Sequence, residues 1–389
     1  MNLLITHEIH AVEAGGRFYN SKGVIDYDAL CNYRISISDI TVLVRCIKAD
    51  KHENDWLRID GEGVSVWPVP EYKSIVKTFL FLPGIAARVL MGIKHCDRYM
   101  VRLPGPTGLF VALLLWLKGK KYAVEFVGHA SESFIETRKR LRFRRFYGRL
   151  FEAAIKFFVH RAHCVAHRSQ YLRKLYPNKC AEKEWVFSGV QLDGVVSRPR
   201  GAEFFSAAPF KVISVGRLQD EKGHKILLEG FRMVCERSGL PVELHLVGDG
   251  PEYPQLEEEA VRLGIGHLVH FYGRVQRGPK LFSLLDEAHL FVLPSLTEGM
   301  PRSLIEAMAR GLPGLGSAVG GIPELLREEC LFPPGDAKAI AEKILSLVGK
   351  PEKLAALSKE NFEQSKHYWP EALAAVNHSF WKEVAEYCK

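Results

Sequence analysis

Two basic residues in the second half of the chain have types and spacing suited to holding a diphosphate. Arg217 and Lys222 lie five residues apart in the stretch VGRLQDEKG. An apolar run precedes them and ends at Gly216. Loops that follow parallel strands are the usual ligand sites of α/β folds. An arginine fork and a lysine point charge at such a place could clamp phosphate oxygens. The alternative is a pair of solvated surface cations.

A turn before a predicted helix could supply backbone donors to the same ligand. The stretch PSLTEGMPRSLIEAMARGLP covers residues 294–313, and a helix is expected to begin at Pro301 or Arg302, because proline suits a first helical turn. The N–H groups of Gly299 and Met300 would then be free to bind sugar hydroxyls or phosphate oxygens.

Two carboxylates accompany this turn. Glu298 stands just before the expected helix, and Glu306 lies eight residues later within it. At roughly 1.5 Å per residue, Glu306 would lie one to two turns deeper. Carboxylates at that separation could bind hydroxyls on different parts of a long ligand. Alternatively, Glu306 is a solvated helix residue, although its apolar neighbours Ile305 and Ala307 leave its exposure open.

A third turn, in the stretch LVGDGP, follows another apolar run. Gly248 and Gly250 occupy two positions of a dinucleotide fingerprint, but Tyr253 stands at the third glycine position. This departure weakens the interpretation that the chain binds a nicotinamide cofactor. Gly248 could bring backbone close to a ligand, and a plain tight turn is the alternative.

The elements that must position these residues follow an alternating pattern. From residue 210 onward, short apolar runs alternate with longer amphipathic segments, which is typical of βαβ units and a parallel sheet. The expected strands are 210–215, 243–247, 269–272, 290–294 and 313–317. The expected helices are 224–238, 252–264, 280–287, 302–310, 322–328 and 337–348.

The N-terminal half shows a looser version of the same alternation. Its expected strands are 2–6, 40–46, 63–67, 98–102, 121–127, 163–166 and 184–188. The pattern predicts an α/β protein of two Rossmann-like domains, joined within residues 190–209, where Gly, Pro and Ser gather. We therefore expect an N-terminal domain over 1–195 and a C-terminal domain over 205–368. A closing helix over 369–389 is expected to return to the first domain.

In combination, the motifs resemble a known family. GR-x-x-x-x-KG, then GDGP, then E-G-x-P-x-x-x-x-E-A-x-A-x-G-x-P follow the order seen in the C-terminal domain of the retaining, nucleotide-sugar-dependent glycosyltransferases of family 4. The resemblance is strong over about residues 210–330. It implies the GT-B fold, in which two Rossmann-like domains face a central cleft and the final helix crosses back to the N-terminal domain.

The resemblance also implies a role for each matching residue. Arg217 and Lys222 would hold the donor diphosphate, and Glu298 would hold the donor sugar. Glu306 would bind the ribose hydroxyls. The other donor-binding positions would be Gly216, Gly248, Gly299, Met300 and Pro301, with Arg274 and Val275 near the base. The two cations would stabilise the charge that builds on the leaving nucleoside diphosphate without a metal, so Lys222→Ala should lose transfer and keep its melting temperature.

The N-terminal half matches the family more weakly. Gly15 and Gly16 resemble the glycine-rich loop that follows the first strand and approaches the donor, and a surface turn is the alternative. His129, in EFVGHAS, occupies the place of a frequent active-site histidine, although Ala130 departs from the common continuation. A structural histidine is the alternative, and the resemblance does not make His129 a general base.

The net charge of +8 is concentrated in one region. Residues 118–179 contain sixteen Lys or Arg and four Glu, a local net charge of +12 that leaves −4 for the rest of the chain. Within it, Arg138, Arg142, Arg145, Arg149 and Lys156 fall on one helical stripe. The opposite face, expected to pack on the core, carries Phe146, Tyr147, Leu150, Phe151, Ala154, Ile155 and Phe158. The stripe is either a solvated face or a surface for an anionic membrane or a polyprenyl-diphosphate acceptor.

These observations predict a retaining glycosyltransferase that moves a sugar from a nucleoside-diphosphate sugar, such as a UDP-sugar, to a saccharide or lipid-linked acceptor. The expected setting is cell-envelope polysaccharide, lipopolysaccharide or glycolipid synthesis. The alternatives are a nucleotide-sugar epimerase of GT-B fold and a catalytically silent binding module. No cofactor, metal or nucleic acid is expected, since no nucleic-acid recognition motif accompanies the charge. We expect a cytoplasmic protein, or one peripheral on the inner face of the membrane, because the N-terminus does not read as a signal peptide.

Overall fold

The structure is a computed structural model of the 389-residue chain, and it describes residues 2–21, 25–34, 37–50, 53, 56–70, 82–130, 143–190, 192 and 198–387. The chain divides into two compact units. Unit 1 comprises residues 1–168, 172–187 and 375–389, and unit 2 comprises 169–171 and 188–374. The division thus falls after Phe187, whereas the sequence placed the linker later, and the last helix joins unit 1 from Ala375 onward.

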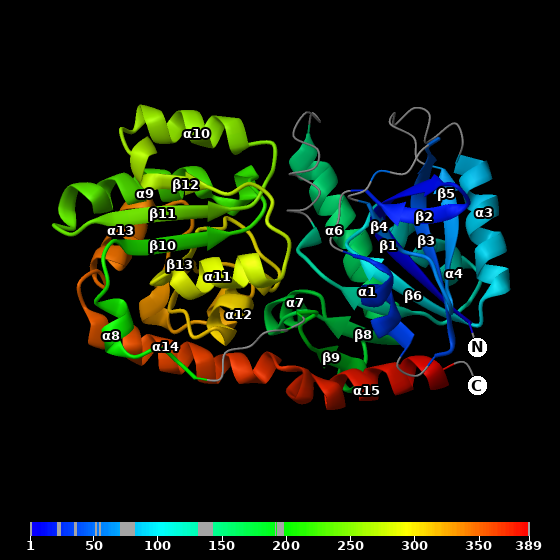
Figure 1. The fold of residues 1–389 in the computed structure, drawn as a ribbon. Helices are drawn as coiled ribbons and strands as arrows, with labels where there is room; N and C mark the ends of the chain where they lie inside the picture. The colour runs from blue at the N-terminus through cyan, green and yellow to red at the C-terminus, as the bar shows by residue number, and fades with distance from the viewer. Residues whose placement is uncertain are drawn as a thin grey trace. The chain divides into compact units, whose positions relative to one another are not determined.

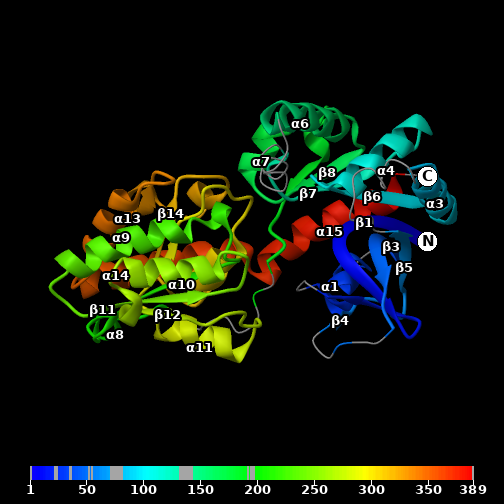
Figure 2. The same cartoon turned by 90° about the horizontal axis from the view of Figure 1, so that it is seen from above.

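Unit 1 is built on one sheet, to which the described residues contribute nine strands. Its strands are β1 (Asn2–Ala14), β2 (Arg17–Asn20), β3 (Asp39–Lys48), β4 (Leu57–Arg58), β5 (Val64–Pro70), β6 (Arg98–Leu103), β7 (Ala123–Phe126), β8 (Cys164–His167) and β9 (Glu184–Val186). Figure 2 shows β3 and β5 on one side of β1 and β6, β7 and β8 on the other, in agreement with the strand pairing. These pairs are parallel, and in the part of unit 1 that the structure describes, β2 and β4 add antiparallel ribbons.

The helices of unit 1 connect these strands. They are α1 (Tyr27–Cys31), α3 (Leu82–His95), α4 (Pro106–Leu117) and α6 (Arg144–Arg161), followed by α7 (Gln170–Leu175), which begins in unit 2. The C-terminal helix α15 (Pro370–Glu386) ends on unit 1, where the Arg98 guanidinium donates to the Ala385 carbonyl at 2.9 Å. Among the described residues, no helix combines the length and apolarity needed to cross a membrane.

Unit 2 is a six-stranded parallel sheet. Its strands are β10 (Phe210–Val215), β11 (Val242–Val247), β12 (Val269–Phe271), β13 (Leu290–Leu293), β14 (Gly314–Ser317) and β15 (Leu331–Phe332). Their order is β12-β11-β10-β13-β14-β15, as Figure 1 shows for the first four. Every residue of β13 is buried, as expected of a parallel strand that is covered on both faces.

Amphipathic helices cover this sheet. They are α8 (Ala202–Phe205), α9 (His224–Arg237), α10 (Tyr253–Arg262), α11 (Pro279–Glu287), α12 (Arg302–Ala309), α13 (Ala337–Leu345) and α14 (Pro351–Ser365). α9 packs against α10 and α13, while α12 packs against α14. Their apolar faces and the strands form one continuous core, and burial of that apolar surface is the main stabilising contribution to the unit.

Among the predicted elements, helix 322–328 and strand 2–6 differ most from the structure. The predicted helix 322–328 is only a 3-10 turn at Ile322–Glu324, because Leu325 and Leu326 both bond back to the Ile322 carbonyl and the backbone is extended at Arg327. The predicted strand 2–6 continues to Ala14, since its second half pairs with β2 and β3.

Candidate functional site

The strand order of unit 2 reverses at one point, between β10 and β13. These two strands are neighbours, with Val212 opposite Leu290, while β11 and β14 lie on their outer sides. Ligands of doubly wound sheets bind beyond the carboxyl ends of the strands at such a switch point. The loops that leave the two strands here carry Arg217 and Glu298.

The structure brings Lys222 and Glu298 into direct contact. Lys222 ends a 3-10 turn, Asp220–Lys222, and its Nζ donates to Glu298 Oε1. The same oxygen accepts the Ser295 hydroxyl at 3.1 Å. The side chains of Lys222 and Glu298 are only 21% and 10% exposed. The predicted phosphate cation and the predicted sugar-binding carboxylate are therefore one partly buried ion pair.

Backbone contacts hold the two loops together beneath this pair. The Leu296 N–H donates to the Glu221 carbonyl at 2.7 Å. Gly223 has a φ of +68° and lies so close to Pro294 that a Cβ would overlap the proline carbonyl oxygen. Only glycine fits this position, because it has no Cβ and adopts positive φ readily.

The turn at Gly248 packs against the turn at Gly216. A Cβ on Gly248, whose φ is +149°, would overlap the Gly216 carbonyl oxygen, while nothing lies within 4 Å of a Cβ on Gly216. The Leu218 N–H donates to the Asp249 carbonyl at 3.0 Å. The close packing of the two turns explains why position 248 requires a glycine. The space beside Gly216, next to Arg217, is open.

Arg217 is exposed, unlike Lys222. In the described part of the chain, no residue accepts a hydrogen bond from its guanidinium or pairs with it. The Arg217 backbone carbonyl accepts the Gln219 N–H at 3.0 Å, which fixes the turn that presents the side chain. The structure thus leaves the five donors of Arg217 available at the switch point.

The turn before α12 has the predicted form. Pro301 is the N-cap of the helix, and α12 begins at Arg302. The Gly299 carbonyl accepts the Gly321 N–H at 2.8 Å, so the turn rests on the loop that follows β14. No described residue accepts the N–H of Met300. A small anion or hydroxyl beyond this helix start would meet free backbone donors.

Glu306 lies on α12 and pairs with an arginine that the sequence reasoning missed. Arg277 Nε donates to Glu306 Oε1 at 3.0 Å, and their side chains are 29% and 14% exposed. Arg277 comes from the loop after β12, which also carries exposed Arg274 and half-buried Val275. The predicted ribose and base residues therefore come from neighbouring parts of unit 2. The two arginines of the sequence GRVQR, after β12, were the signal that could have indicated Arg277 as a site residue.

His129 follows β7 in unit 1, at the carboxyl edge of that sheet. It is half-buried, and its ring lies edge-on to Tyr176 with the centroids 5.9 Å apart. The Tyr176 hydroxyl accepts the Ala130 N–H at 3.0 Å. Packing against a buried tyrosine thus fixes the loop that carries His129.

Gly15 and Gly16 form a surface turn, which was the alternative to a loop that approaches the donor. They form the exposed turn between the antiparallel strands β1 and β2, with φ values of +57° and +73°. Two residues at positive φ are what a tight hairpin turn requires, and no atom lies within 4 Å of a Cβ at either position. The pair therefore lies on a hairpin tip, not on a loop that joins a strand to a helix.

Sequence comparison addresses the family directly. Residues 200–364 match the family described as Glycosyl transferases group 1. These residues form a group 1 glycosyltransferase domain. The domain contains Arg217, Lys222, Glu298 and Glu306, which agrees with the resemblance stated from the motifs.

Relatives of this chain include Protein CapJ of Staphylococcus aureus. CapJ is 25% identical over 357 residues, which cover 89% of this chain and 87% of CapJ. The amylovoran biosynthesis glycosyltransferase AmsK of Erwinia amylovora is 36% identical over 183 residues, but that match spans only 44% of AmsK and 43% of this chain.

Solved structures similar to this chain show its fold. Anabaena Alr3699/HepE, solved with UDP and glucose, aligns with a TM-score of 0.67 at 18% identity, over 99% of both chains. The lipopolysaccharide outer core galactosyltransferase WaaB aligns with a TM-score of 0.64 at 16% identity, also over 99% of both chains. The predicted GT-B fold is confirmed.

Unit 1 has a switch point of its own, between β1 and β6. The register of β1 on β3 shifts between Thr6 and His10, so Glu8 lies at an irregularity of the kind that re-aims side chains. The Glu8 carboxylate accepts the Thr107 N–H at 2.9 Å, near the start of α4, and the Arg45 guanidinium at 2.9 Å. A carboxylate near a helix N-terminus is electrostatically favourable.

A buried charged cluster lies beside this switch point, and the sequence reasoning missed it. Glu125 on β7 is 2% exposed and accepts Arg102 at 3.2 Å, Arg168 and the Tyr33 hydroxyl. Burial, with the nearby Arg102 charge, holds the pKa of His7 well below its usual value. A charged residue inside the buried strand AVEF was the signal that could have indicated this cluster.

The basic helix of unit 1 differs from the prediction. Arg138 and Arg142 lie outside the described residues, and Arg145 and Arg149 are exposed on α6. The predicted core face is buried only in the second half of α6, at residues such as Phe158, where α4 packs through Trp116. In the first half, this same face is exposed, with Phe146 at 65%, Tyr147 at 44% and Leu150 at 60%. Phe143, just before the helix, is exposed at 67%, and these four residues form the exposed stripe.

Proposed function

We propose that the protein is a retaining glycosyltransferase that moves a sugar from a nucleoside-diphosphate sugar to an acceptor. The observation that carries this proposal is the partly buried Lys222–Glu298 pair, at the switch point of a group 1 glycosyltransferase domain and on the loops that also carry Arg217. Doubly wound folds bind phosphorylated ligands at this place. The Arg277–Glu306 ion pair would lie where the ribose and the base of the nucleotide bind.

In the proposed reaction, Arg217 and Lys222 bind the diphosphate of the donor. As the bond between the anomeric carbon and the phosphate oxygen breaks, both cations stabilise the negative charge on the leaving nucleoside diphosphate. The acceptor oxygen bonds to the anomeric carbon on the same face, and its proton passes to the departing phosphate oxygen. We propose that this transfer needs no metal, because the two cations supply the positive charge.

The proposed acceptors are intermediates of cell-envelope polysaccharide, lipopolysaccharide or glycolipid synthesis. The names of relatives and structural neighbours support this class, since AmsK is described as an amylovoran biosynthesis glycosyltransferase and WaaB as a lipopolysaccharide galactosyltransferase. The HepE structure was solved with UDP and glucose, which makes a UDP-sugar the first donor to test.

A thermal-shift panel of UDP-, GDP- and ADP-sugars tests the donor. A ligand that binds only the folded state at 100 times its dissociation constant stabilises it by about 2.7 kcal/mol, so the matching donor should raise the melting temperature by roughly 5–10 °C. Failure of every nucleotide sugar to shift the melting temperature would contradict the donor assignment. Product analysis of the donor that binds then separates the classes, because an epimerase converts the sugar without an acceptor and a silent module converts nothing.

The exposed stripe on α6 supports a peripheral site at the inner face of the cell membrane. Phe143, Phe146 and Leu150 present apolar side chains to solvent, and Arg145 and Arg149 lie on the same two turns. Aromatic and apolar side chains bind at the headgroup boundary while arginines attract anionic lipids. We therefore propose an anionic lipid surface as the partner of this helix.

Binding of the full-length protein to vesicles tests the membrane partner. We expect it to sediment with phosphatidylglycerol-rich vesicles at low salt and much less at high salt, because each cation contributes about 1 kcal/mol. The double variant Arg145→Glu/Arg149→Glu should weaken binding by about 30-fold or more, whereas Arg237→Glu on α9 should leave it unchanged. Equal sedimentation with neutral and anionic vesicles, or none with either, would rule out the proposed surface.

A further inference from the structure

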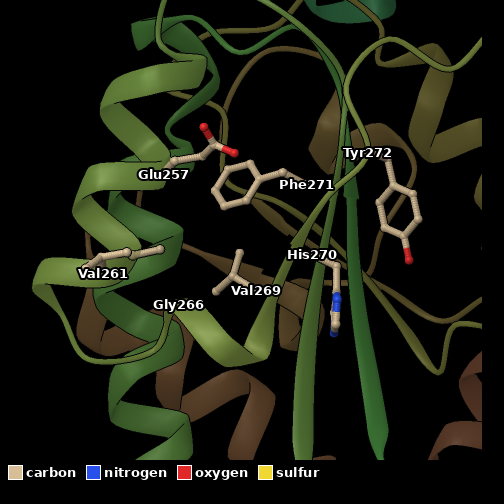
Figure 3. Close-up of a pocket in the computed structure, with 8 residues that line it drawn as sticks. Glu257, Val261, Gly266, Val269, His270, Phe271 and Tyr272 are labelled. Carbon is tan, nitrogen blue, oxygen red and sulfur yellow. The ribbon is translucent and has the colours of Figure 1, made fainter.

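Three side chains of the kind that bind metals share one face of the unit 2 sheet. Glu243 and His245 are two residues apart on β11, and His270 on β12 lies directly opposite His245. Side chains two apart on a strand point to the same face. Figure 3 shows Phe271 of β12 turned toward Val261 of α10 and Tyr272 turned away from it. Alternation along β12 thus places His270 and Tyr272 on the face away from α10.

The spacing of the three groups suits a single small cation. His245 Nε2 lies 3.3 Å from Glu243 Oε2, and His270 Nε2 lies 3.7 Å from the same oxygen. One ligand atom from each residue falls within 4.8 Å of the others. A tetrahedral zinc ion with bonds of about 2.0–2.1 Å keeps its ligand atoms roughly 3.4 Å apart. Small side-chain rotations would therefore complete the coordination.

A second group orients the buried histidine. The Tyr272 hydroxyl lies 2.8 Å from His245 Nδ1, and His245 is 8% exposed. Histidines that bind metals usually engage their other ring nitrogen in a hydrogen bond, which fixes the tautomer and the ring orientation. With Nδ1 held by Tyr272, Nε2 is the ring nitrogen of His245 that faces Glu243.

A cation on the neighbouring strand β10 has a carboxylate partner of its own. Lys211 lies opposite Glu243 on β10, but its ammonium pairs with Glu287 at 3.3 Å. Glu243 thus remains the carboxylate that faces both rings.

From this arrangement we infer that Glu243, His245 and His270 bind one divalent transition-metal ion, with Zn²⁺ as the favoured ion and water as its fourth ligand. Two imidazoles and one carboxylate form a ligand set that suits zinc. The ion would join the three-residue edge strand β12 to β11, at the base of the loop that carries Arg274 and Arg277. This site lies on the strands, apart from Lys222 and Glu298, so its role is structural and compatible with metal-independent transfer.

Metal binding to the full-length protein tests the site. After chelator treatment and dialysis, Zn²⁺ is titrated by calorimetry, and Co²⁺ is followed by its visible absorption. We expect the wild type to bind one more equivalent of Zn²⁺ than His270→Ala and to show the intense visible bands of tetrahedral Co²⁺. A thiolate-to-cobalt charge-transfer band lost on cysteine alkylation, with no difference between the two proteins, would assign the binding to cysteines and overturn the proposal.

Matched variants separate binding from folding. His270 is exposed to 45%, so His270→Ala should fold normally, and Glu243→Gln removes the charged ligand. Zn²⁺ should raise the melting temperature by several degrees for the wild type and for the control His267→Ala, an exposed histidine on the neighbouring turn. The shift should vanish in both ligand variants, and Zn²⁺ affinity should fall at least 100-fold. Retention of the shift in His270→Ala, or its absence in the wild type, would refute the site.

Discussion

Replacing Lys222 with alanine is expected to lower the turnover number of sugar transfer by about 100- to 1,000-fold. Removal of one preorganised group that stabilises developing negative charge typically costs this much. Lys222 is held at the switch point by its ion pair with Glu298 and by the loop contacts at Gly223. Its ammonium therefore needs little reorganisation as the leaving diphosphate gains charge.

The ion pair changes what this variant should do to stability. From the sequence alone, Lys222→Ala should keep its melting temperature. In the structure, Glu298 is 10% exposed, and without Lys222 the described residues leave it only the Ser295 hydroxyl. A nearly buried carboxylate without its cation destabilises the fold. We now expect the melting temperature to fall by a few degrees.

A double variant tests both parts of this expectation. Lys222→Ala/Glu298→Gln removes the stranded charge, so its melting temperature should recover toward that of the wild type while transfer stays low. Lys225→Ala, an exposed lysine on the next helix, serves as the control with normal rate and stability. Release of nucleoside diphosphate and circular dichroism melts supply the two measurements. A near-normal rate for Lys222→Ala would remove Lys222 from the phosphate site.

The sequence sufficed to predict the framework of unit 2 because its elements are locally encoded. Apolar runs such as LFVL become buried parallel strands, and proline and glycine mark the start of α12. Short segments with conflicting signals were harder. The stretch 322–328 has apolar residues at helical spacing, yet Pro323 and the backbone bonds to Ile322 limit it to a single turn.

The pairings within the site could not be predicted in the same way. Lys222 and Glu298 are 76 residues apart, and Arg277 and Glu306 are 29 apart. Contacts of this kind depend on which strands become neighbours, and alternation along one strand does not specify that order. The exposed stripe on α6 could not be predicted for the same reason. Periodicity identifies an apolar face of the helix, but it does not show how much of that face α4 covers.

The buried cluster around Glu125 should dominate the stability of unit 1. Its carboxylate is 3% exposed and lies between the guanidinium groups of Arg102 and Arg168. Removing one partner of a buried ion pair costs about 3–5 kcal/mol, because the remaining charge stays buried without compensation. Glu125→Ala leaves two arginines without their shared anion, so the melting temperature should fall by roughly 10 °C or more.

Replacing the whole cluster distinguishes charge imbalance from lost packing. If stranded arginines cause the loss, Arg102→Met/Glu125→Leu/Arg168→Met should recover most of the melting temperature, because apolar residues of similar volume often replace buried ion pairs without cost. Glu152→Ala, which breaks the more exposed pair with Lys156 on α6, should change stability by about 1 kcal/mol or less. Equal losses for Glu125→Ala and Glu152→Ala, measured by thermal and urea unfolding, would show that the cluster contributes no more than a surface pair. A different result is that Glu125→Ala loses stability as expected but the triple variant does not regain the melting temperature. The cluster would then stabilise unit 1 through its directional hydrogen bonds, including the one from Tyr33.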